Sequence, residues 1–151
     1  YKGYLISQTS LKDKSKSDLD INKYVDSTQV PYLVFPGKFS TVKGTGLMGD
    51  FGYAINLDAN KIAPFIVADI GPPNAHLGEM SIALANALGG TNPNPRTGSG
   101  TPKGKIVYVI FPYSRSAPAW PLTQDEIQSN ATSLLSTIGG EKVLRICADV
   151  L

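Results

Sequence analysis

The clearest pattern of hydrophobic and polar positions lies in the centre of the chain. An apolar, β-branched run at residues 65–68 predicts a buried strand that ends on Asp69. The Gly-Pro-Pro sequence at residues 71–73 excludes regular structure and predicts a loop. Apolar residues then recur at helical spacing after Ser81, a good N-cap, and a Gly-Gly pair stops them. The centre therefore predicts a strand, a stiff loop and a short helix.

The rest of the chain predicts more strands and a second short helix. Apolar runs bounded by Pro, Gly, Asn or Asp indicate strands at residues 4–9, 31–35, 51–55, 62–68, 106–111 and 143–150. The 106–111 run is apolar almost throughout, which is typical of a core strand. Thr123 and Glu126 form a capping box that begins a helix with one apolar face.

A turn at residues 58–61 should join two of these strands into a hairpin. Antiparallel pairing then brings Asp50, before the first strand, and Asp69, after the second, to the same end. With six or seven strands and two short helices, the chain is expected to be mainly β, a single domain over residues 1–151.

Composition agrees with a globular protein. Hydrophobic residues make up 42% of the 151 positions and charged residues 17%, which excludes disorder, and 15 Gly with 11 Pro favour short strands and shaped loops over a helical bundle. No apolar run is long enough to cross a bilayer, so we expect no membrane partner. The chain starts at Tyr1 without a signal-peptide pattern, and we expect that a leader or flanking segment was removed.

Several kinds of chemistry are excluded by residue type. A single Cys and a single His cannot build a zinc site of the usual kind, and no internal disulfide is possible. Cys147 lies in an apolar run and is expected to be a small core residue. A Ser-His-Asp triad could use only His76, and neither a nucleophile elbow nor a phosphate-binding glycine motif is present. Carboxylate chemistry is what remains.

The net charge of +2 is unevenly distributed. Residues 44–102 carry four acidic residues against one Lys and one Arg, while both flanking thirds are positive. Lys12, Lys14 and Lys16 could suggest nucleic acid, but they alternate with Asp13 and Ser and have no aromatic residues among them. We interpret them as a solvated loop and expect no nucleic-acid partner.

Asp69 and Glu79 flank the rigid central loop. A carboxylate at the end of an apolar strand is costly to bury unless it is paired or used. Two of them at a fixed separation suggest an acid/base pair. The alternative is structural: Asp before a Gly-Pro turn and Glu before a helix N-cap are both ordinary local chemistry.

The chain resembles the secreted chitosanases of glycoside hydrolase family 75. The resemblance rests on Ser7-x-Thr9-x-Leu11, Tyr24-Val25-Asp26, Pro31-Tyr32, Gly49-Asp50-Phe51 and above all residues 67–90, VADIGPPNAHLGEMSIALANALGG. It implies a secreted enzyme that cleaves chitosan internally with inversion, and it implies that Asp69 and Glu79 are the essential pair. We assign Glu79 as general acid and Asp69 as general base.

The same Asp-x-Gly-Pro signature is similar to that of rare lipoprotein A and the expansins, which are double-psi β-barrels. This similarity implies a six-stranded double-psi β-barrel. It also supplies the alternatives: a peptidoglycan lytic enzyme, or a wall polysaccharide-binding module without hydrolysis.

Five further residues are candidates for substrate binding. Asp50 could bind a glucosamine ammonium, aromatic rings on loops could stack on sugars, and a histidine in the central loop could line a cleft; the candidates are Asp50, Tyr53, His76, Tyr113 and Trp120. Each has a structural alternative in turn formation, packing or plain exposure. No cofactor and no metal is implied, and the protein is expected to act as a monomer on a polysaccharide.

Overall fold

The computed structural model describes residues 6–150. Its strands are β1 (Tyr32–Phe35), β2 (Phe51–Asn56), β3 (Lys61–Ile70) and β4 (Ile106–Ile110). Its α-helices are α1 (Ile82–Ala87), α2 (Gln124–Thr137) and α3 (Gly140–Asp149), and its two 3-10 helices are η1 (Ile21–Lys23) and η2 (Gly37–Thr41).

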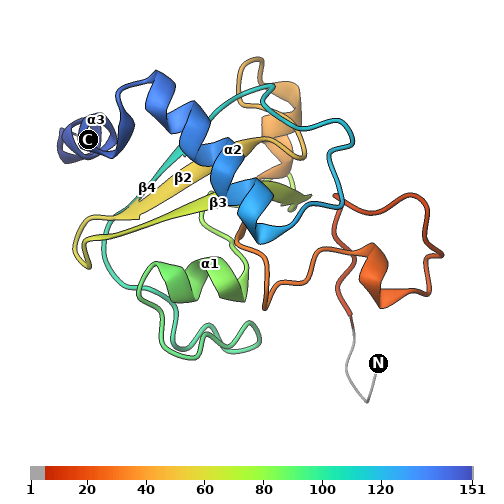
Figure 1. Ribbon diagram of the computed structural model, residues 1–151. Helices are drawn as coiled ribbons and strands as arrows, with labels where there is room; N and C mark the ends of the chain where they lie inside the picture. The colour runs from red at the N-terminus through yellow and green to blue at the C-terminus, as the bar shows by residue number, and fades with distance from the viewer. Residues whose placement is uncertain (1–5, 151) are drawn as a thin grey trace.

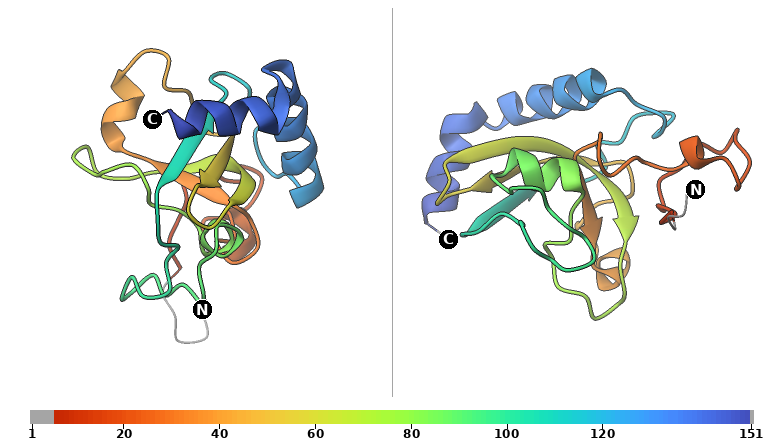
Figure 2. Two further views of the ribbon diagram at one scale, coloured as in Figure 1. Left: turned by 90° about the vertical axis from the view of Figure 1, so that its left-hand side faces the viewer. Right: turned by 90° about the horizontal axis from the view of Figure 1, so that it is seen from below.

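The strands form one sheet in the order β1-β3-β2-β4. β1 runs parallel to β3, whereas β2 is antiparallel to both β3 and β4. The sheet curls into a half-barrel, as the two views of Figure 2 show. The prediction of a mainly β protein is confirmed, but the described residues form four strands, and the six-stranded double-psi β-barrel is not confirmed.

Helices cover both faces of the sheet (Figure 1). On one face, α2 buries Ile127, Ala131 and Leu135 against a cluster that includes Phe51 and Ile66. On the other face, α1 contributes to a second cluster, whose buried members are Leu33, Phe35, Ala54, Ala63, Phe65, Val67, Leu84 and Leu88. β3 supplies side chains to both clusters because successive residues of a strand point to opposite faces.

The predicted local signals at three elements are confirmed. Ser81 caps α1, where its hydroxyl accepts a hydrogen bond from the Leu84 N–H at 3.1 Å. The capping box of α2 is complete, with Thr123 and Glu126 bonding reciprocally. The β2–β3 hairpin pairs Asn56 with Lys61 next to its turn. β3 and α1, which lie on either side of the central loop, hold its two ends.

Three predictions about elements are wrong. Residues 143–150 form most of α3 and not a strand, because Leu144 and Ala148, four residues apart, are the positions that α3 buries. Cys147 is consequently exposed and not a core residue. Residues 6–9 form no strand; the first two residues of the predicted 4–9 strand lie outside the described residues.

β4 differs from its prediction in position. It is an edge strand, and all five of its residues are only half-buried. An edge strand has one neighbour, so an apolar run alone does not identify a central strand. Within residues 6–150, no helix is long and apolar enough to cross a membrane.

Candidate active site

The central loop after β3 is pinned to the chain that follows β1. The Gly71 N–H donates to the Phe35 carbonyl at 2.8 Å, and the Gly37 N–H donates to the Pro72 carbonyl at 3.0 Å. A Cβ at Gly37 would lie 2.7 Å from the Gly71 carbonyl oxygen, so the close approach requires glycine there. Backbone bonds and two prolines therefore hold the start of the loop in place.

β1 lies between two segments, each of which carries one of the predicted carboxylates. On one edge, Val34 pairs in register with Asp69 of β3. On the other edge, the Val34 N–H donates to the Glu79 carbonyl at 2.9 Å, next to an antiparallel bridge between Leu33 and Met80. Asp69, Val34 and Glu79 are thus neighbours across three adjacent extended segments.

A β-bulge gives Asp69 its direction. The register between β1 and β3 shifts after Leu33, so that Asp69 and not Ala68 stands opposite Val34. Residues opposite each other in a sheet project from the same face, and a bulge re-aims side chains in this way beside many active sites. Both carboxylates therefore share the face of Val34.

The sheet geometry sets the backbone separation of the pair. Asp69 and Glu79 lie on either side of β1, so their Cα atoms are two strand spacings apart, roughly 9–10 Å. The side chain of Glu79 folds back over the loop, and its Oε2 lies 3.6 Å from the position of a Cβ built on Gly71. The structure thus brings the two predicted catalytic residues to one site.

Asp69 is half-buried and fixed on one oxygen. Its Oδ1 accepts hydrogen bonds from the Ser10 N–H at 2.9 Å, the Ser10 hydroxyl at 2.7 Å and the Ile70 N–H at 2.9 Å. Among residues 6–150, none donates a hydrogen bond to Oδ2. One oxygen orients the carboxylate, which leaves the other to accept a proton. Glu79, by contrast, is exposed.

Tyr32 belongs to the same site, although the sequence analysis did not propose it. Burial, as the largest cause, and the negative charges of Asp69, Glu79 and Asp26 together raise the pKa of its phenol to about 12. A side-chain hydrogen bond with Ser27 acts in the opposite direction on this pKa. The three carboxylates thus lie within electrostatic range of the phenol.

Asp26 is the second residue that sequence reasoning missed. It is exposed, and its Oδ1 accepts bonds from the Thr28 N–H at 2.8 Å and the Thr28 hydroxyl at 2.7 Å. The neighbouring Ser27 carbonyl accepts from the Ala83 N–H at 2.9 Å, which ties this turn to α1. Tyr24-Val25-Asp26 and Pro31-Tyr32 were noted only as matching motifs, and no local pattern marks them as parts of one site.

Asp50 is placed differently from its prediction as an ammonium-binding residue. It lies at the same end of the hairpin as Asp69, as expected, but it is fully buried. Its carboxylate accepts from the backbone N–H groups of Leu47, Tyr113 and Arg115 at 2.6, 2.8 and 3.0 Å. A carboxylate without exposed surface and with three such donors joins two loops, and this position favours the structural alternative for Asp50.

The aromatic and histidine candidates for substrate binding also differ in how far their side chains are exposed. Tyr53 is buried in the core, with its hydroxyl 2.8 Å from that of Thr132, so its position favours packing over sugar binding. Tyr113 is 63% exposed, and His76 is exposed on the central loop. Trp120 is half-buried and lines a surface hollow.

Two hollows lie near the carboxylate pair. The first, of about 690 Å³, lies between the segment 10–15 and the loop 115–121, and it contains Trp120 and the Ser10 that holds Asp69. The second, of about 630 Å³, lies between α1, the loop 93–104 and the end of the central loop, and Glu79 is its only charged lining residue. Glu79 therefore lines the second hollow directly, whereas Asp69 is linked to the first hollow through Ser10.

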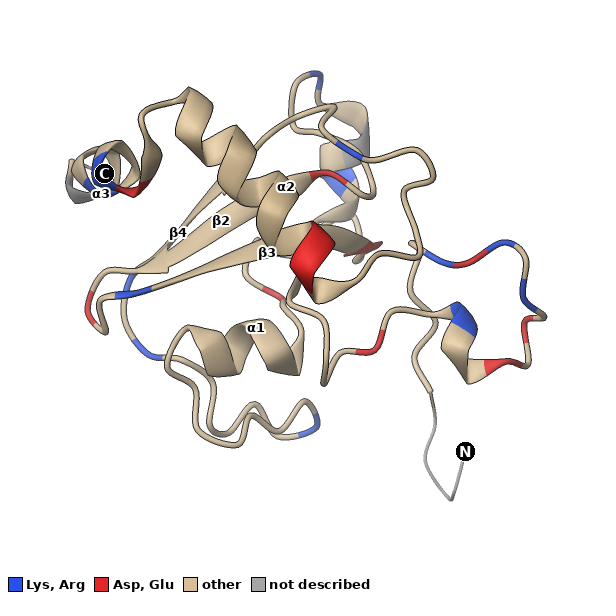
Figure 3. Ribbon diagram, in the orientation of Figure 1, with Lys and Arg blue, Asp and Glu red and all other residues tan. Residues whose placement is uncertain are grey.

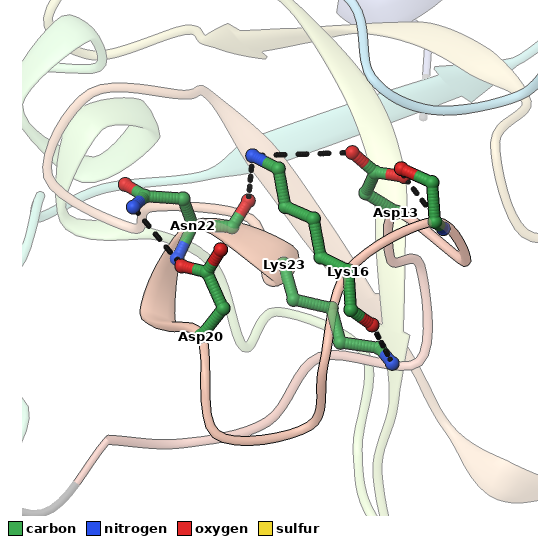
Figure 4. A network of polar contacts seen from close by, with 6 residues as sticks. Asp13, Lys16, Asp20, Asn22 and Lys23 are labelled. Atoms are coloured by element: carbon green, nitrogen blue, oxygen red, sulfur yellow. Dashed lines mark hydrogen bonds and ion pairs between the residues drawn. The ribbon is translucent and has the colours of Figure 1, made fainter.

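The lysine cluster near the first hollow is partly neutralised within its own loop (Figure 3). The ammonium of Lys16 lies 3.9 Å from Asp13 and donates to the Asn22 carbonyl at 3.1 Å. Lys23 donates to the Lys16 carbonyl at 2.7 Å, as Figure 4 shows, and pairs with Asp18 at 2.7 Å. These contacts agree with the interpretation of a solvated loop.

The described part of the chain holds no group of three or more His, Cys, Asp or Glu side chains arranged to bind a metal ion.

The model of a protein family described as fungal chitosanase of glycosyl hydrolase group 75 matches residues 3–143. No curated protein matches the sequence.

Proposed function

Because the chain belongs to the fungal chitosanase family of glycosyl hydrolase group 75, we propose that it cleaves β-1,4 bonds within chitosan by inversion, with Asp69 and Glu79 as the catalytic pair. Family membership implies a glycoside hydrolase acting on chitosan. The observation that carries the finer proposal is the placement of both carboxylates beside Val34, on one face and two strand spacings apart.

The separation supports inversion. Inverting glycosidases hold their two carboxyl groups about 6.5–9.5 Å apart to leave room for a water molecule, whereas retaining enzymes hold them at about 5–5.5 Å. A backbone separation of roughly 9–10 Å, with one strand between the two residues, suits the wider arrangement. In this proposal the attacking water occupies the space over Val34.

Each carboxylate has a distinct role. Asp69, whose Oδ1 is held by three donors, presents Oδ2 as the general base that takes a proton from water. Glu79 lines the second hollow and acts as the general acid that protonates the leaving glycosidic oxygen. The two hollows, one lined by Glu79 and the other by the Ser10 that holds Asp69, support internal cleavage, since an open surface lets a chain pass without ending there.

The setting of the enzyme follows from its substrate. Chitosan is a polymer too large to enter cells, which supports our proposal that the protein is secreted. We also propose that it acts as a monomer. Trp120 and Tyr113 remain candidates for contact with sugar rings through their faces, and His76 for a polar contact from the loop.

The stereochemistry of the product tests this proposal. Proton NMR during the first minutes of hydrolysis of a chitosan oligomer should show the α-anomer before mutarotation, because inversion of a β-linkage gives α. Viscosity should fall faster than reducing ends accumulate if cleavage is internal. A β-anomer would contradict inversion, and release of reducing ends from peptidoglycan but not from chitosan would favour the lytic alternative.

A further inference from the structure

Tyr32 lies on the catalytic face next to both carboxylates. It precedes Val34 by two residues in β1, so the two side chains share a face of the sheet. Two hydrogen bonds to Ser81 fix its backbone on the edge that carries Glu79. The Tyr32 N–H donates to the Ser81 hydroxyl at 2.9 Å, and the Ser81 N–H donates to the Tyr32 carbonyl at 3.0 Å. The phenol is thus attached to a rigid strand between the two carboxylate segments.

The phenol keeps its proton under all conditions in which the enzyme would work. Its half-buried position and the three nearby negative charges disfavour the phenolate, and its pKa rises to about 12. The side-chain hydrogen bond with Ser27 lowers this pKa but does not reverse the shift. The phenol therefore stays protonated and remains a hydrogen-bond donor.

We propose that Tyr32 is a third catalytic residue, whose phenol O–H donates to the water that attacks the sugar between Asp69 and Glu79. This inference rests on the proposed function. Water has two lone pairs, so one can accept the phenol proton as a hydrogen bond while the other attacks the anomeric carbon. Asp69 accepts the proton that the water loses, and the phenol fixes the orientation of the attacking lone pair.

Tyr32 neither gains nor loses a proton in the step. The bond between the anomeric carbon and the water oxygen forms while the bond to the glycosidic oxygen breaks. One proton passes from water to Asp69, and one passes from Glu79 to the leaving oxygen. Exchange with solvent then restores both carboxyl groups.

The direct test is Tyr32→Phe, which removes the hydroxyl and keeps the ring that packs against the core. Loss of a hydrogen bond that orients the attacking water should lower kcat by about ten- to a hundredfold, with KM changed by less than about twofold. The matched control is Tyr24→Phe, since the Tyr24 hydroxyl donates to the Asp18 carbonyl at 3.2 Å, away from the carboxylates. This control should keep wild-type kcat and KM.

A double-mutant cycle separates a role on the water from a structural role. If Tyr32 and Asp69 act on one water, Tyr32→Phe should cost little further in an Asp69→Asn background, because the water is already misplaced. In a Glu79→Gln background, the factor lost through Tyr32→Phe should stay the same, since the leaving group is a separate partner. Equal losses in both backgrounds would overturn the proposal.

Two further outcomes would also overturn it. If the kcat of Tyr32→Phe stayed within twofold of wild type, Tyr32 would have no catalytic role. If only KM rose, Tyr32 would be a sugar-binding residue. Failure of the inference differs from failure of the proposed function, because the latter is seen when the wild-type protein does not hydrolyse chitosan at all.

Discussion

Two aspartates at the same end of the β2–β3 hairpin have opposite surroundings. Asp50 is fully buried, and three backbone N–H groups from two loops occupy its carboxylate. Asp69 is half-buried, and its three donors all bind one oxygen. The two carboxylates therefore have equal numbers of donors but differ in exposure and in how the donors are shared between their oxygens. We predict that this difference separates a structural carboxylate from a catalytic one.

The largest effect on activity is expected at Asp69 and Glu79. Asp69→Asn and Glu79→Gln are nearly isosteric, so each should remove the proton transfer and lower kcat by roughly two orders of magnitude or more. The melting temperature should change little, because neither residue is fully buried. Steady-state kinetics on chitosan and a thermal melt measure the two quantities. A variant with more than a tenth of wild-type kcat and a normal melt would show that its residue is not catalytic.

The opposite result is expected at Asp50. In Asp50→Asn, an amide NH₂ replaces one acceptor and must face a backbone donor, which should cost about 2–4 kcal/mol of unfolding free energy. For a chain of this size, that lowers the melting temperature on the order of 10 °C. The kcat of the folded protein should stay within about threefold of wild type. A stable but inactive Asp50→Asn variant would reverse the comparison and restore the substrate-binding prediction.

Sequence reasoning was most accurate where the physical signal is local. The Ser81 cap, the Thr123 capping box and the turn between β2 and β3 depend on residues only a few positions apart, and all three are confirmed. α3 was missed because its apolar residues were counted as a run. The exposed positions Lys142 and Ile146, four residues apart, mark the solvent face of this helix, whereas Arg145 is half-buried and donates to Asn60 of the hairpin turn at 2.6 Å.

The candidate site shows the limit of such reasoning. Asp69 and Glu79 could be proposed because they flank one loop, but Tyr32 comes next to them only through strand pairing, and Asp26 lies in a turn that is bonded to α1. The acidic middle third of the sequence likewise does not form one surface. Asp50 is buried and Asp58 lies at the turn, the other end of the hairpin from Asp69, so the charge near the site comes from Asp26 instead.

A moderate effect is expected at Asp26, the exposed acidic neighbour of the pair. Asp26→Asn keeps the Oδ1 that accepts from Thr28 but removes one negative charge, so KM for chitosan should rise by up to about fivefold at low salt, the value of an exposed charge pair. Salt should have the same effect on the wild type, since the Debye length falls from about 10 Å at 0.1 M to about 3 Å at 1 M. Asp58→Asn, with the same charge change at the distant turn, is the control. Equal KM shifts in both variants would contradict local ammonium recognition.

The smallest effect is expected at the first hollow, where charge and substrate are mismatched. Lys12, Lys14 and Arg115 line this hollow together with a single acid, Asp13, which already interacts with Lys16. Chitosan is cationic, so these bases should repel ammonium groups on the side of the pair that carries Asp69, whereas Glu79 attracts them on the other. Removing one exposed base, Lys14→Gln, should therefore lower KM for fully deacetylated chitosan, but by less than about twofold, because solvent and salt screen an exposed charge. The gain should shrink as the acetylated fraction of the substrate rises, since acetylation removes the ammonium groups that Lys14 repels.

Lys142→Gln, an equal charge change on the exposed surface of α3, should leave KM unchanged. If both lysine variants lower KM equally, net charge and not the first hollow controls the attraction; if neither does, the chain of sugars does not cross the side of the site that carries Lys14.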